Sequence, residues 1–237
     1  MIRTGTPEEA AANRRKLTLA NGTGYFKSEF IASPFDAPLG PQSFLVEQDP
    51  DSVILPHFHL QNEFQVVVQG GGQFGRHDVR PLSVHYAGAH TGYGPITSGS
   101  GGLWYFTLRP RMDQGAMFLP ESRELMQKVP KRQLLGQPLS VGEECARRTV
   151  AVCEEAIAPQ KDGIGGWLLR LPPNGALAAP AHAGGLARFY MIAAGRARVT
   201  GALLPRWATV FVTPEEEPVE VQAGGEGAEV LVLQFPQ

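Results

Sequence analysis

Two histidines and a glutamate stand close together in the order His57-x-His59-x3-Glu63-x6-Gly70. Residues i and i+2 of a β-strand project from the same face, so the two imidazoles would point the same way. A carboxylate four residues further on can return beside them from the next strand. Two imidazoles and one carboxylate around a point are the ligands of an open site for a divalent transition metal. We therefore expect His57, His59 and Glu63 to bind such a metal.

The spacing of these four residues is specific. At the composition of this chain, His, His, Glu and Gly at these offsets would occur by chance in roughly one sequence per thousand. The alternative is that the histidines are ordinary residues with hydrogen-bond partners and that Glu63 is a solvated strand residue. In a regular strand, Gln65 and Val67 share the face of Glu63. We expect both to line the cavity, with Gln65 beside the metal ligands or the substrate.

This motif resembles the first motif of the cupin superfamily, whose members are small double-sheet jelly rolls that hold a metal inside the barrel. The resemblance covers the first half of the chain well and the second half weakly, through an internal repeat. The whole chain is thus similar to two-domain cupins of the RmlC-like type. The resemblance implies an all-β fold of two tandem double-stranded β-helix (jelly-roll) barrels. It also implies that His57, His59 and Glu63 are three metal ligands in the first barrel.

The resemblance implies a fourth ligand as well, a histidine three residues after a Pro-x-Gly turn, and here the sequence departs from the pattern. The corresponding stretch, residues 84–96, has no such string. His90 is our first choice because imidazole is the usual group at that place. Tyr93, close to the family's ligand position in the repeat alignment, is the alternative. His85 lies within an expected strand, where it would point to the opposite face, and water could also complete a site of three ligands.

The two halves of the chain repeat each other. A shift of 125 residues pairs residues 44–110 with residues 169–235 without a gap, and the apolar runs and turn glycines coincide. Gly70 then meets Gly195, and Gly102 meets Gly227. We infer two copies of one β-unit.

The second copy lacks the metal ligands. His182 and Gly184 stand in the places of the two histidines, and Arg188 takes the place of Glu63. A guanidinium cannot coordinate a cation and would repel one. We expect the second barrel to be free of metal, with Arg188 either paired with a carboxylate or binding an anion.

Short apolar runs separated by Gly, Pro, Asp and Ser are typical of an all-β chain. Thr6-Pro7-Glu8-Glu9 has an N-cap, a proline at the first helical position and a capping-box glutamate, which predicts a short helix over Pro7–Lys16. A second helical piece is expected over Pro120–Lys128, at the start of a polar connection. The predicted division is a barrel with the metal site at residues 1–115, a linker at 116–147 and a barrel without it at 148–237.

Composition restricts the partners. The chain of 237 residues has 21 Lys and Arg against 23 Asp and Glu, a formal charge of −2, so no basic surplus is present to neutralise phosphates. We expect no nucleic-acid partner. The N-terminus has no apolar signal core and no apolar run approaches the roughly 18 residues of a membrane span, which predicts a cytoplasmic protein with no membrane partner. Cys145 and Cys153 are expected to be thiols rather than a disulfide.

The cupin resemblance implies a metal-dependent enzyme acting on a small-molecule substrate. Iron is the first expectation for two histidines and a carboxylate, with Mn, Ni or Zn as alternatives, and a dioxygenase-type oxidoreductase is the leading function. A non-redox isomerase or lyase, in which the metal polarises a carbonyl, and a non-catalytic metal- or ligand-binding cupin are the alternatives. No catalytic residue is identified. The apolar outer strand faces favour a homodimer. Residues that could meet an anionic or aromatic substrate are Arg76, His77, Arg80, Trp104, Tyr105, Arg109 and Arg111.

Overall fold

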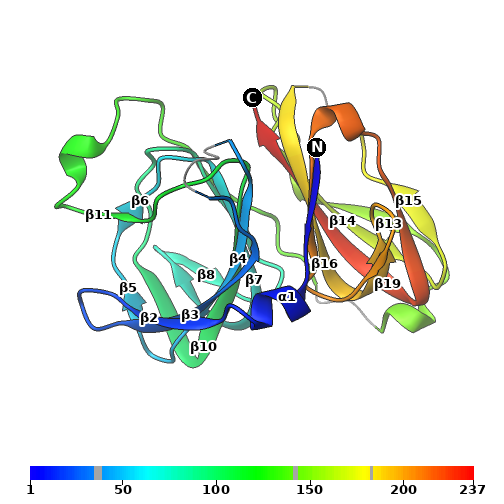
Figure 1. The fold of residues 1–237 in the computed structure, drawn as a ribbon, viewed down its shortest axis with the longest axis horizontal. Helices are drawn as coiled ribbons and strands as arrows, with labels where there is room; N and C mark the ends of the chain where they lie inside the picture. Colours follow the sequence, from blue (N-terminus) through cyan, green and yellow to red (C-terminus); the bar gives the residue numbers. More distant parts are fainter. Residues whose placement is uncertain (35–38, 141–143, 182–183) are drawn as a thin grey trace. The chain divides into compact units, whose positions relative to one another are not determined.

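The computed structural model describes residues 1–34, 39–140, 144–181 and 184–237, and it divides into two compact units. The first unit is Ala11–Leu135, and the second unit is Gly136–Gln237 together with Met1–Ala10. Each unit is built around one large antiparallel sheet (Figure 1). The predicted all-β fold with two β-units is confirmed.

A nine-stranded sheet builds the first unit. Its strands follow the order β12-β9-β7-β10-β4-β3-β2, with β5 paired to β10 and β8 paired to β7, while β6 and β11 form a separate pair. Alternate side chains of the long strands β7 and β10 point inward, where Val67, Leu103 and Tyr105 join the core. The bounds are β2 Arg15–Thr18, β3 Gly24–Ile31, β4 Gln42–Gln48, β5 Val53–Ile54, β6 His57–Phe58, β7 Glu63–Phe74, β8 His77–Val79, β9 Val84–Ala87, β10 Ile96–Arg109, β11 Met117–Phe118 and β12 Gln133–Leu135.

An eight-stranded sheet builds the second unit, in the order β1-β18-β16-β19-β14-β13, with β15 paired to β19 and β17 to β16. Its core is rich in valine and leucine, and Leu169, Val210 and Val232 are among the fully buried residues. The bounds are β1 Ile2–Gly5, β13 Val152–Ile157, β14 Gly165–Leu171, β15 Ala176–Ala178, β16 Gly185–Arg198, β17 Leu203–Leu204, β18 Thr209–Val212 and β19 Glu220–Pro236.

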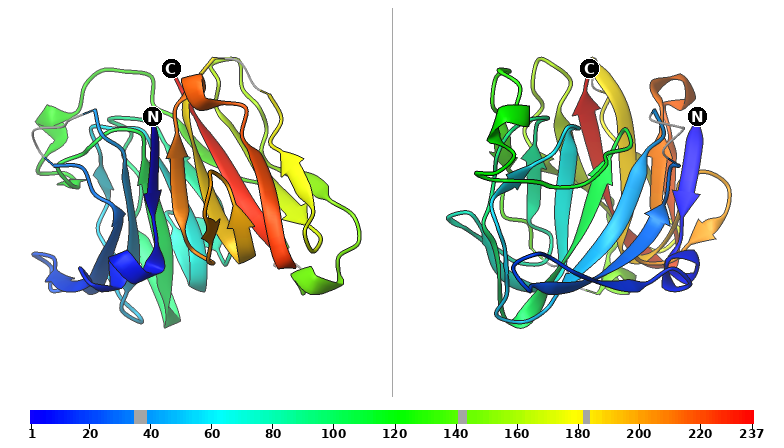
Figure 2. Two further views of the ribbon diagram at one scale, coloured as in Figure 1. Left: turned by 45° about the vertical axis from the view of Figure 1, so that its right-hand side comes forward. Right: turned by 60° about the vertical axis from the view of Figure 1, so that its left-hand side comes forward.

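The first strand of the chain belongs to the second unit. β1 pairs antiparallel with β18, with Ile2 opposite Val212 and Gly5 opposite Thr209 (Figure 2). At the other end of the first unit, β12 pairs with β9, so the chain does not leave that unit until Leu135. The units therefore differ from the expected boundaries at residues 115 and 147. The reason is strand pairing: β12, from the expected linker, pairs within the first sheet, and β1, from the N-terminus, pairs within the second.

Both expected helices are shorter than the sequence predicts. Helix α1 covers only Pro7–Ala11, although its capping box forms: the Thr6 main-chain N–H donates to Glu9 Oε2 at 3.1 Å, and the Glu9 N–H donates to Thr6 Oγ1 at 3.3 Å. The predicted continuation to Lys16 is wrong because the chain from Arg15 onward pairs as β2 with β3. In the polar connection, the predicted helix over residues 120–128 is reduced to the single turn η1, Arg123–Leu125. Two further short turns are η2, Cys145–Arg147, and η3, Pro214–Glu216.

Glycines mark the repeat in the backbone itself. Gly70 has φ +73°, and a Cβ there would lie 2.1 Å from the Gly102 carbonyl oxygen. Gly195 has φ +67°, and a Cβ there would lie 2.1 Å from the Gly227 carbonyl oxygen. Each pair lies at an irregularity in the pairing of two long strands, β7 with β10 in the first unit and β16 with β19 in the second. Only glycine tolerates both the positive φ and the close approach.

Neither cysteine forms a disulfide, since Cys145 is a buried free thiol and Cys153 an exposed one. No helix in the described residues is long and apolar enough to span a membrane.

Candidate metal centre

The two motif histidines lie in the interior of the first unit. His57 begins β6, and its main chain pairs with Tyr93 through N–H to O hydrogen bonds of 3.0 and 2.9 Å. His59 follows β6, and the rings of His57 and His59 meet edge to face with centroids 5.2 Å apart. Both residues are buried. The shared face expected from the i, i+2 spacing is therefore present, and it points inward.

The His57 ring is held through Nδ1, which lies 2.7 Å from the Leu55 carbonyl oxygen. A carbonyl oxygen only accepts, so the ring proton is on Nδ1. Burial, and then the neighbouring His59, lower the pKa of His57 to about 4, so the ring is neutral near pH 7. Its Nε2 therefore carries a lone pair, and this atom faces the Tyr93 hydroxyl at 2.9 Å.

The His59 ring is held in the same way by Asp113, which the sequence did not single out. His59 Nδ1 donates to Asp113 Oδ1 at 2.9 Å, and Asp113 also accepts from the main-chain N–H groups of Leu60 and Gly115, each at 2.8 Å. Burial acts to raise the pKa of Asp113, but the hydrogen bond from His59 and the charge of Arg109 outweigh it and lower the pKa to about 2. Asp113 is therefore a carboxylate that orients His59, as the outer partners of metal-ligating histidines do.

Glu63 opens β7 and is fully buried. Its Oε1 accepts from the Tyr93 hydroxyl at 2.5 Å, and its Oε2 accepts from Arg109 Nε at 2.9 Å and Arg109 Nη2 at 2.8 Å. The same Nη2 lies 3.1 Å from His59 Nε2. Burial acts to raise the pKa of Glu63, but His59, Arg109 and the hydrogen bond from Tyr93 together hold it below its ordinary value. Glu63 is thus ionised and shared between a guanidinium and a phenol.

The hydrogen-bond acceptors around the Tyr93 hydroxyl outnumber the protons available to them. Tyr93 has a single hydroxyl hydrogen, but its oxygen faces two acceptors, His57 Nε2 and Glu63 Oε1. Gln65 Nε2 already donates to the same oxygen at 3.1 Å. One of the two buried acceptors therefore faces the phenol oxygen with no hydrogen between them, which is costly. A cation at this point would remove the deficit, and the donors present, imidazole, carboxylate and phenol, are those that transition metals bind.

The cluster is nevertheless not arranged as a finished metal site. In the ranges that the structure describes, no three His, Cys, Asp or Glu side chains form a group able to hold an ion as they stand. The cause is local, because Arg109 holds one oxygen of Glu63 and Tyr93 the other. The donor chemistry fits a divalent metal once Glu63 turns one oxygen away from these two partners.

His90, the first choice for a fourth ligand, is not brought to this cluster. Its main-chain N–H donates to the His59 carbonyl at 2.7 Å, but its ring lies beside Phe58, with centroids 5.9 Å apart, and its Nδ1 accepts from the Gln127 N–H at 3.3 Å. Phe58 lies between the two motif histidines and so points to the opposite face. Tyr93, the alternative, is the residue that contacts both His57 and Glu63.

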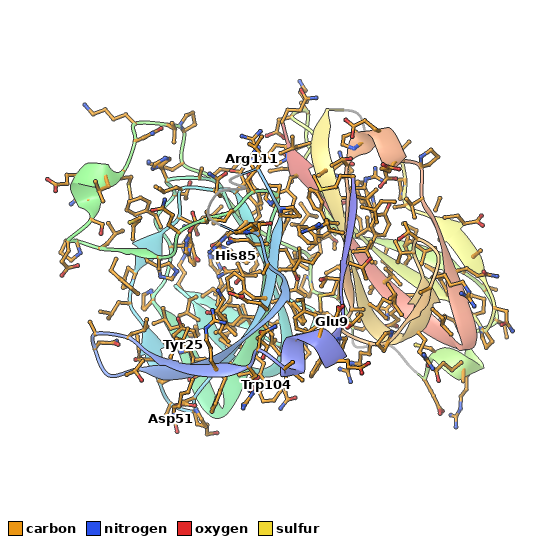
Figure 3. The ribbon with its side chains drawn as sticks, viewed as in Figure 1. Glu9, Tyr25, Asp51, His85, Trp104 and Arg111 are labelled. Carbon is orange, nitrogen blue, oxygen red and sulfur yellow. The ribbon has the colours of Figure 1, made fainter. Side chains whose placement is uncertain are left out.

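His85 and Gln65 extend the cluster into the barrel. Gln65 lies opposite His85 in the β7–β9 register, so their side chains share a face, and His85 Nδ1 donates to Gln65 Oε1 at 2.8 Å. Figure 3 shows His85 in the interior of the first unit. The expectation that His85 points to the opposite face is therefore wrong. The face of its side chain is set by the register between β9 and β7, which places His85 opposite Gln65, and the pattern of β9 alone does not contain that register.

A cavity of about 260 Å³ opens beside the cluster. Gln65 lines it as expected, whereas Val67 is not among its lining residues and packs in the core. The expected ligands His57, His59 and Tyr93 also line it, and so do Tyr105 and Arg109, which were expected only as contacts for a substrate. The remaining lining residues were not expected. The polar ones among them are Tyr25, Lys27, Thr107, Asp113 and Gln114.

The sequence matches no protein-family model and no curated protein. Solved structures, however, match the chain over its whole length. A putative dioxygenase from Nostoc punctiforme is 13% identical, with TM-score 0.61, over 100% of this chain and 79% of that one. The bacterial pirin YhhW from Escherichia coli, solved with nickel(II), is 12% identical, with TM-score 0.59, over 100% and 99% of the two chains. The coconut allergen cocosin is 10% identical, with TM-score 0.61, over 100% and 85%.

The chain has the two-barrel cupin fold. At these identities the likeness establishes the fold alone, and the chemistry has to be argued from the residues. In the first cupin barrel, His57 and Glu63 both contact the Tyr93 hydroxyl, and His59 Nε2 lies 3.8 Å from Glu63 Oε2. In the second cupin barrel, Arg188 stands in the place of Glu63 and pairs with Gln234, whereas His182 lies outside the described residues.

Proposed function

We propose that the first cupin barrel binds a divalent transition metal through His57, His59 and Glu63, with Tyr93 at the fourth position. The observation that carries this proposal is that both imidazoles are fixed through Nδ1, one to the Leu55 carbonyl and one to Asp113. Both Nε2 atoms therefore face the interior, where one meets the Tyr93 hydroxyl and the other meets Arg109 Nη2. Hydrogen-bonded outer partners of this kind set the tautomer that metal ligation requires. A nickel-bound neighbour with the same fold supports the choice of a divalent metal.

We further propose that the barrel is a dioxygenase-type oxidoreductase acting on a small organic molecule. An iron ion, or Mn or Ni, would supply open coordination positions and redox chemistry at this site. The protein's own part is to hold and select the substrate: the cavity of about 260 Å³ admits only a small molecule, and Lys27 and Arg109 line it as hydrogen-bond donors. Each cation is paired with a carboxylate, Lys27 with Glu29 at 2.9 Å and Arg109 with Glu63 at 2.8 Å, so the two favour a substrate with an oxygen acceptor. Tyr93 donates its hydroxyl proton to Glu63 in a hydrogen bond and keeps it, because burial and the charge of Glu63 raise the pKa of Tyr93 well above its ordinary value.

A non-redox isomerase or lyase is the second candidate. The observation in its favour is that Arg109 and Tyr93, both hydrogen-bond donors, line the same cavity as His57 and His59. A substrate carbonyl polarised by a metal at these histidines would lie within reach of both donors. A third, non-catalytic role in binding a ligand uses the same residues.

Metal content and oxygen uptake separate these functions. The chain is purified without added metal, its metals are identified by elemental analysis, and oxygen consumption is followed with catechols, gentisate-like acids and β-diketones. A stoichiometric redox metal with substrate-dependent oxygen uptake is the expected result. Stoichiometric zinc with no oxygen uptake would overturn the dioxygenase and leave the lyase or binding role, and absence of any metal that binds stoichiometrically would overturn the site itself.

A further inference from the structure

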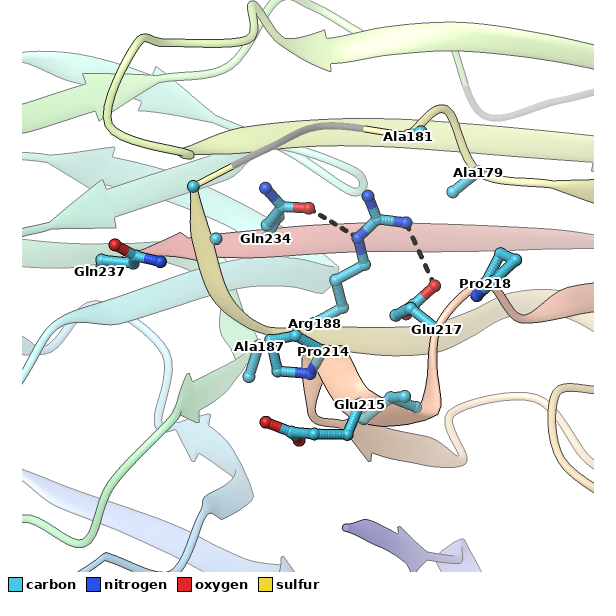
Figure 4. A pocket seen from close by; sticks show the side chains of 13 residues that line it. Ala179, Ala181, Ala187, Arg188, Pro214, Glu215, Glu217, Pro218, Gln234 and Gln237 are labelled. Atoms are coloured by element: carbon cyan, nitrogen blue, oxygen red, sulfur yellow. Dashed lines mark hydrogen bonds and ion pairs between the residues drawn. The ribbon is translucent and has the colours of Figure 1, made fainter.

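The second unit contains a cavity of its own, about 720 Å³ in volume. Figure 4 shows Arg188 extending into it, with Gln234 and Glu217 beside the guanidinium. The walls are small and apolar and are formed by Ala179, Ala187, Val212, Pro214 and Pro218. A hollow of this size with largely apolar walls and a few polar groups, among them Arg188, has the composition of a small-molecule site.

The Arg188 guanidinium is held in a fixed position. Arg188 lies on β16 directly opposite Gln234 on β19, and its Nε donates to Gln234 Oε1 at 2.7 Å. Its Nη2 donates to the Pro180 carbonyl at 2.9 Å, and the group lies 5.5 Å from the centre of the Trp167 ring. Only 7% of Arg188 is exposed. A buried, fixed guanidinium loses little conformational entropy when it binds a ligand.

The charge of Arg188 is poorly neutralised. Its ion pair with Glu217 is long, 3.5 Å, and Glu217 is itself held by the Tyr190 hydroxyl at 2.7 Å and the Val219 N–H at 3.1 Å. The other two buried arginines of the described residues have close carboxylates: Arg109 lies 2.8 Å from Glu63, and Arg170 contacts Glu154 at 2.5 Å and also pairs with Glu229. A buried cation without a close counter-ion is unfavourable unless something else supplies the negative charge.

We propose that the second unit binds a small organic monocarboxylate, with its carboxylate on Arg188 and its apolar part on the surrounding walls. Guanidinium and carboxylate match in charge and planar geometry. Two carboxylates also line the cavity, Glu215 and Glu217, the second of which is the distant partner of Arg188. They oppose negative charge on the ligand, so Arg188 can offset one such charge but not two. The site therefore selects monocarboxylates over dicarboxylates and phosphate. The proposal concerns only the second unit and does not depend on the metal in the first.

Isothermal titration calorimetry of the full chain with benzoate and isobutyrate tests the proposal, with benzamide and phthalate as the neutral and doubly charged comparisons. Saturable binding of benzoate or isobutyrate, with benzamide and phthalate each at least about tenfold weaker, is expected. Two results would overturn the proposal: no binding of either monocarboxylate at concentrations on the order of 1 mM, or binding of benzamide as tight as that of benzoate.

Three variants locate the site. Arg188→Gln should weaken monocarboxylate binding by about 10-fold to 100-fold. Arg206→Gln, which removes an exposed arginine of the same unit, should leave binding unchanged. Ala181→Trp changes an exposed residue on the lining, keeps Arg188 and should weaken binding by obstructing the cavity, so the proposal stays testable if Arg188→Gln folds poorly. Unchanged binding in Ala181→Trp and in a folded Arg188→Gln would place the carboxylate elsewhere.

Discussion

Glu63 and Arg188 occupy the same position in their two sheets, 125 residues apart. Each lies one residue before a phenylalanine that pairs with a leucine of a long neighbouring strand, Phe64 with Leu108 of β10 in one unit and Phe189 with Leu233 of β19 in the other. Each also receives the side chain that projects next from that neighbouring strand, Arg109 and Gln234 respectively. The two barrels thus present opposite charges at one point of a common framework.

Removal of Arg109 should expose how far it competes with a metal for Glu63. Arg109→Gln leaves a fully buried carboxylate without its cation, and breaking such a pair costs about 3–5 kcal/mol of folding free energy. Added Mn(II) or Ni(II) should restore part of this stability, so the increase in melting temperature on metal addition should be larger in the variant than in the unmodified protein.

The matched control for Arg109→Gln is Arg111→Gln, two residues away and exposed, for which the response to metal should not change. An Arg109→Gln protein that folds but gains no more from metal than the parent would show that guanidinium and metal do not share Glu63.

Asp113→Asn should weaken metal binding by about 10-fold to 100-fold, because the amide no longer fixes the His59 tautomer as a carboxylate does. Titration of the metal-free protein with Co(II) or Ni(II), followed by absorbance, measures the affinity. Asp78→Asn, an exposed change in the same unit, is the control. Equal affinities in the two variants would contradict the role given to Asp113.

Tyr93→Phe distinguishes a ligand from a neighbouring donor. The variant removes the oxygen that contacts His57 and Glu63, and we expect metal affinity to fall by about tenfold or more. Tyr105→Phe removes a hydroxyl from the same cavity and should keep the affinity of the parent. If Tyr93→Phe binds metal as well as Tyr105→Phe does, the fourth position belongs to water or another group.

Substitution of the crossing glycines should destabilise each unit separately. Gly70→Ala and Gly195→Ala each combine a positive φ with a Cβ 2.1 Å from a carbonyl oxygen, and each should cost more than about 2 kcal/mol of unfolding free energy. Gly22→Ala has φ +85° but open space around the new Cβ, so it isolates the cost of the dihedral alone and should be milder. Chemical denaturation curves give all three values.

Deletion of residues 1–5 should loosen the second unit rather than the first. The deletion removes β1 and leaves β18 as an unpaired edge. Hydrogen exchange measured by mass spectrometry should show faster exchange in Thr209–Val212, with β7 and β10 of the first unit unchanged. Faster exchange confined to the first unit would contradict the assignment of β1.

The sequence predicts the parts of this protein that depend on short-range pattern. The alternation of side chains places Glu63 and Gln65 on one face, and the capping box at Thr6 forms as expected. The length of α1 could not be predicted, because pairing of Arg15 with β3 ends it.

Partners of the site that are far apart in sequence were not predictable in the same way. Asp113 reaches His59 across 54 residues, and no local spacing signals that contact. Arg109 was one of seven weak candidates for a substrate contact, and its pairing with Glu63 emerges only from the β7–β10 register. Tyr93 and His90 contact opposite sides of β6, since Tyr93 meets His57 and His90 meets Phe58. The sequence of one strand does not show which side each of these rings reaches.

The glycine crossings, Gly70 with Gly102 and Gly195 with Gly227, are present in both units, whereas the side chains that line the two cavities differ. At the crossings the main chains of two strands are in contact, so no residue larger than glycine fits there. A side chain that lines a cavity can be replaced without displacing the strands around it. The constraint on the scaffold is therefore separate from the constraint on the side chains that line each cavity. The two units accordingly differ in charge at the inward positions of two strands, Glu63 and Arg109 in one and Arg188 and Gln234 in the other, with the same scaffold around them.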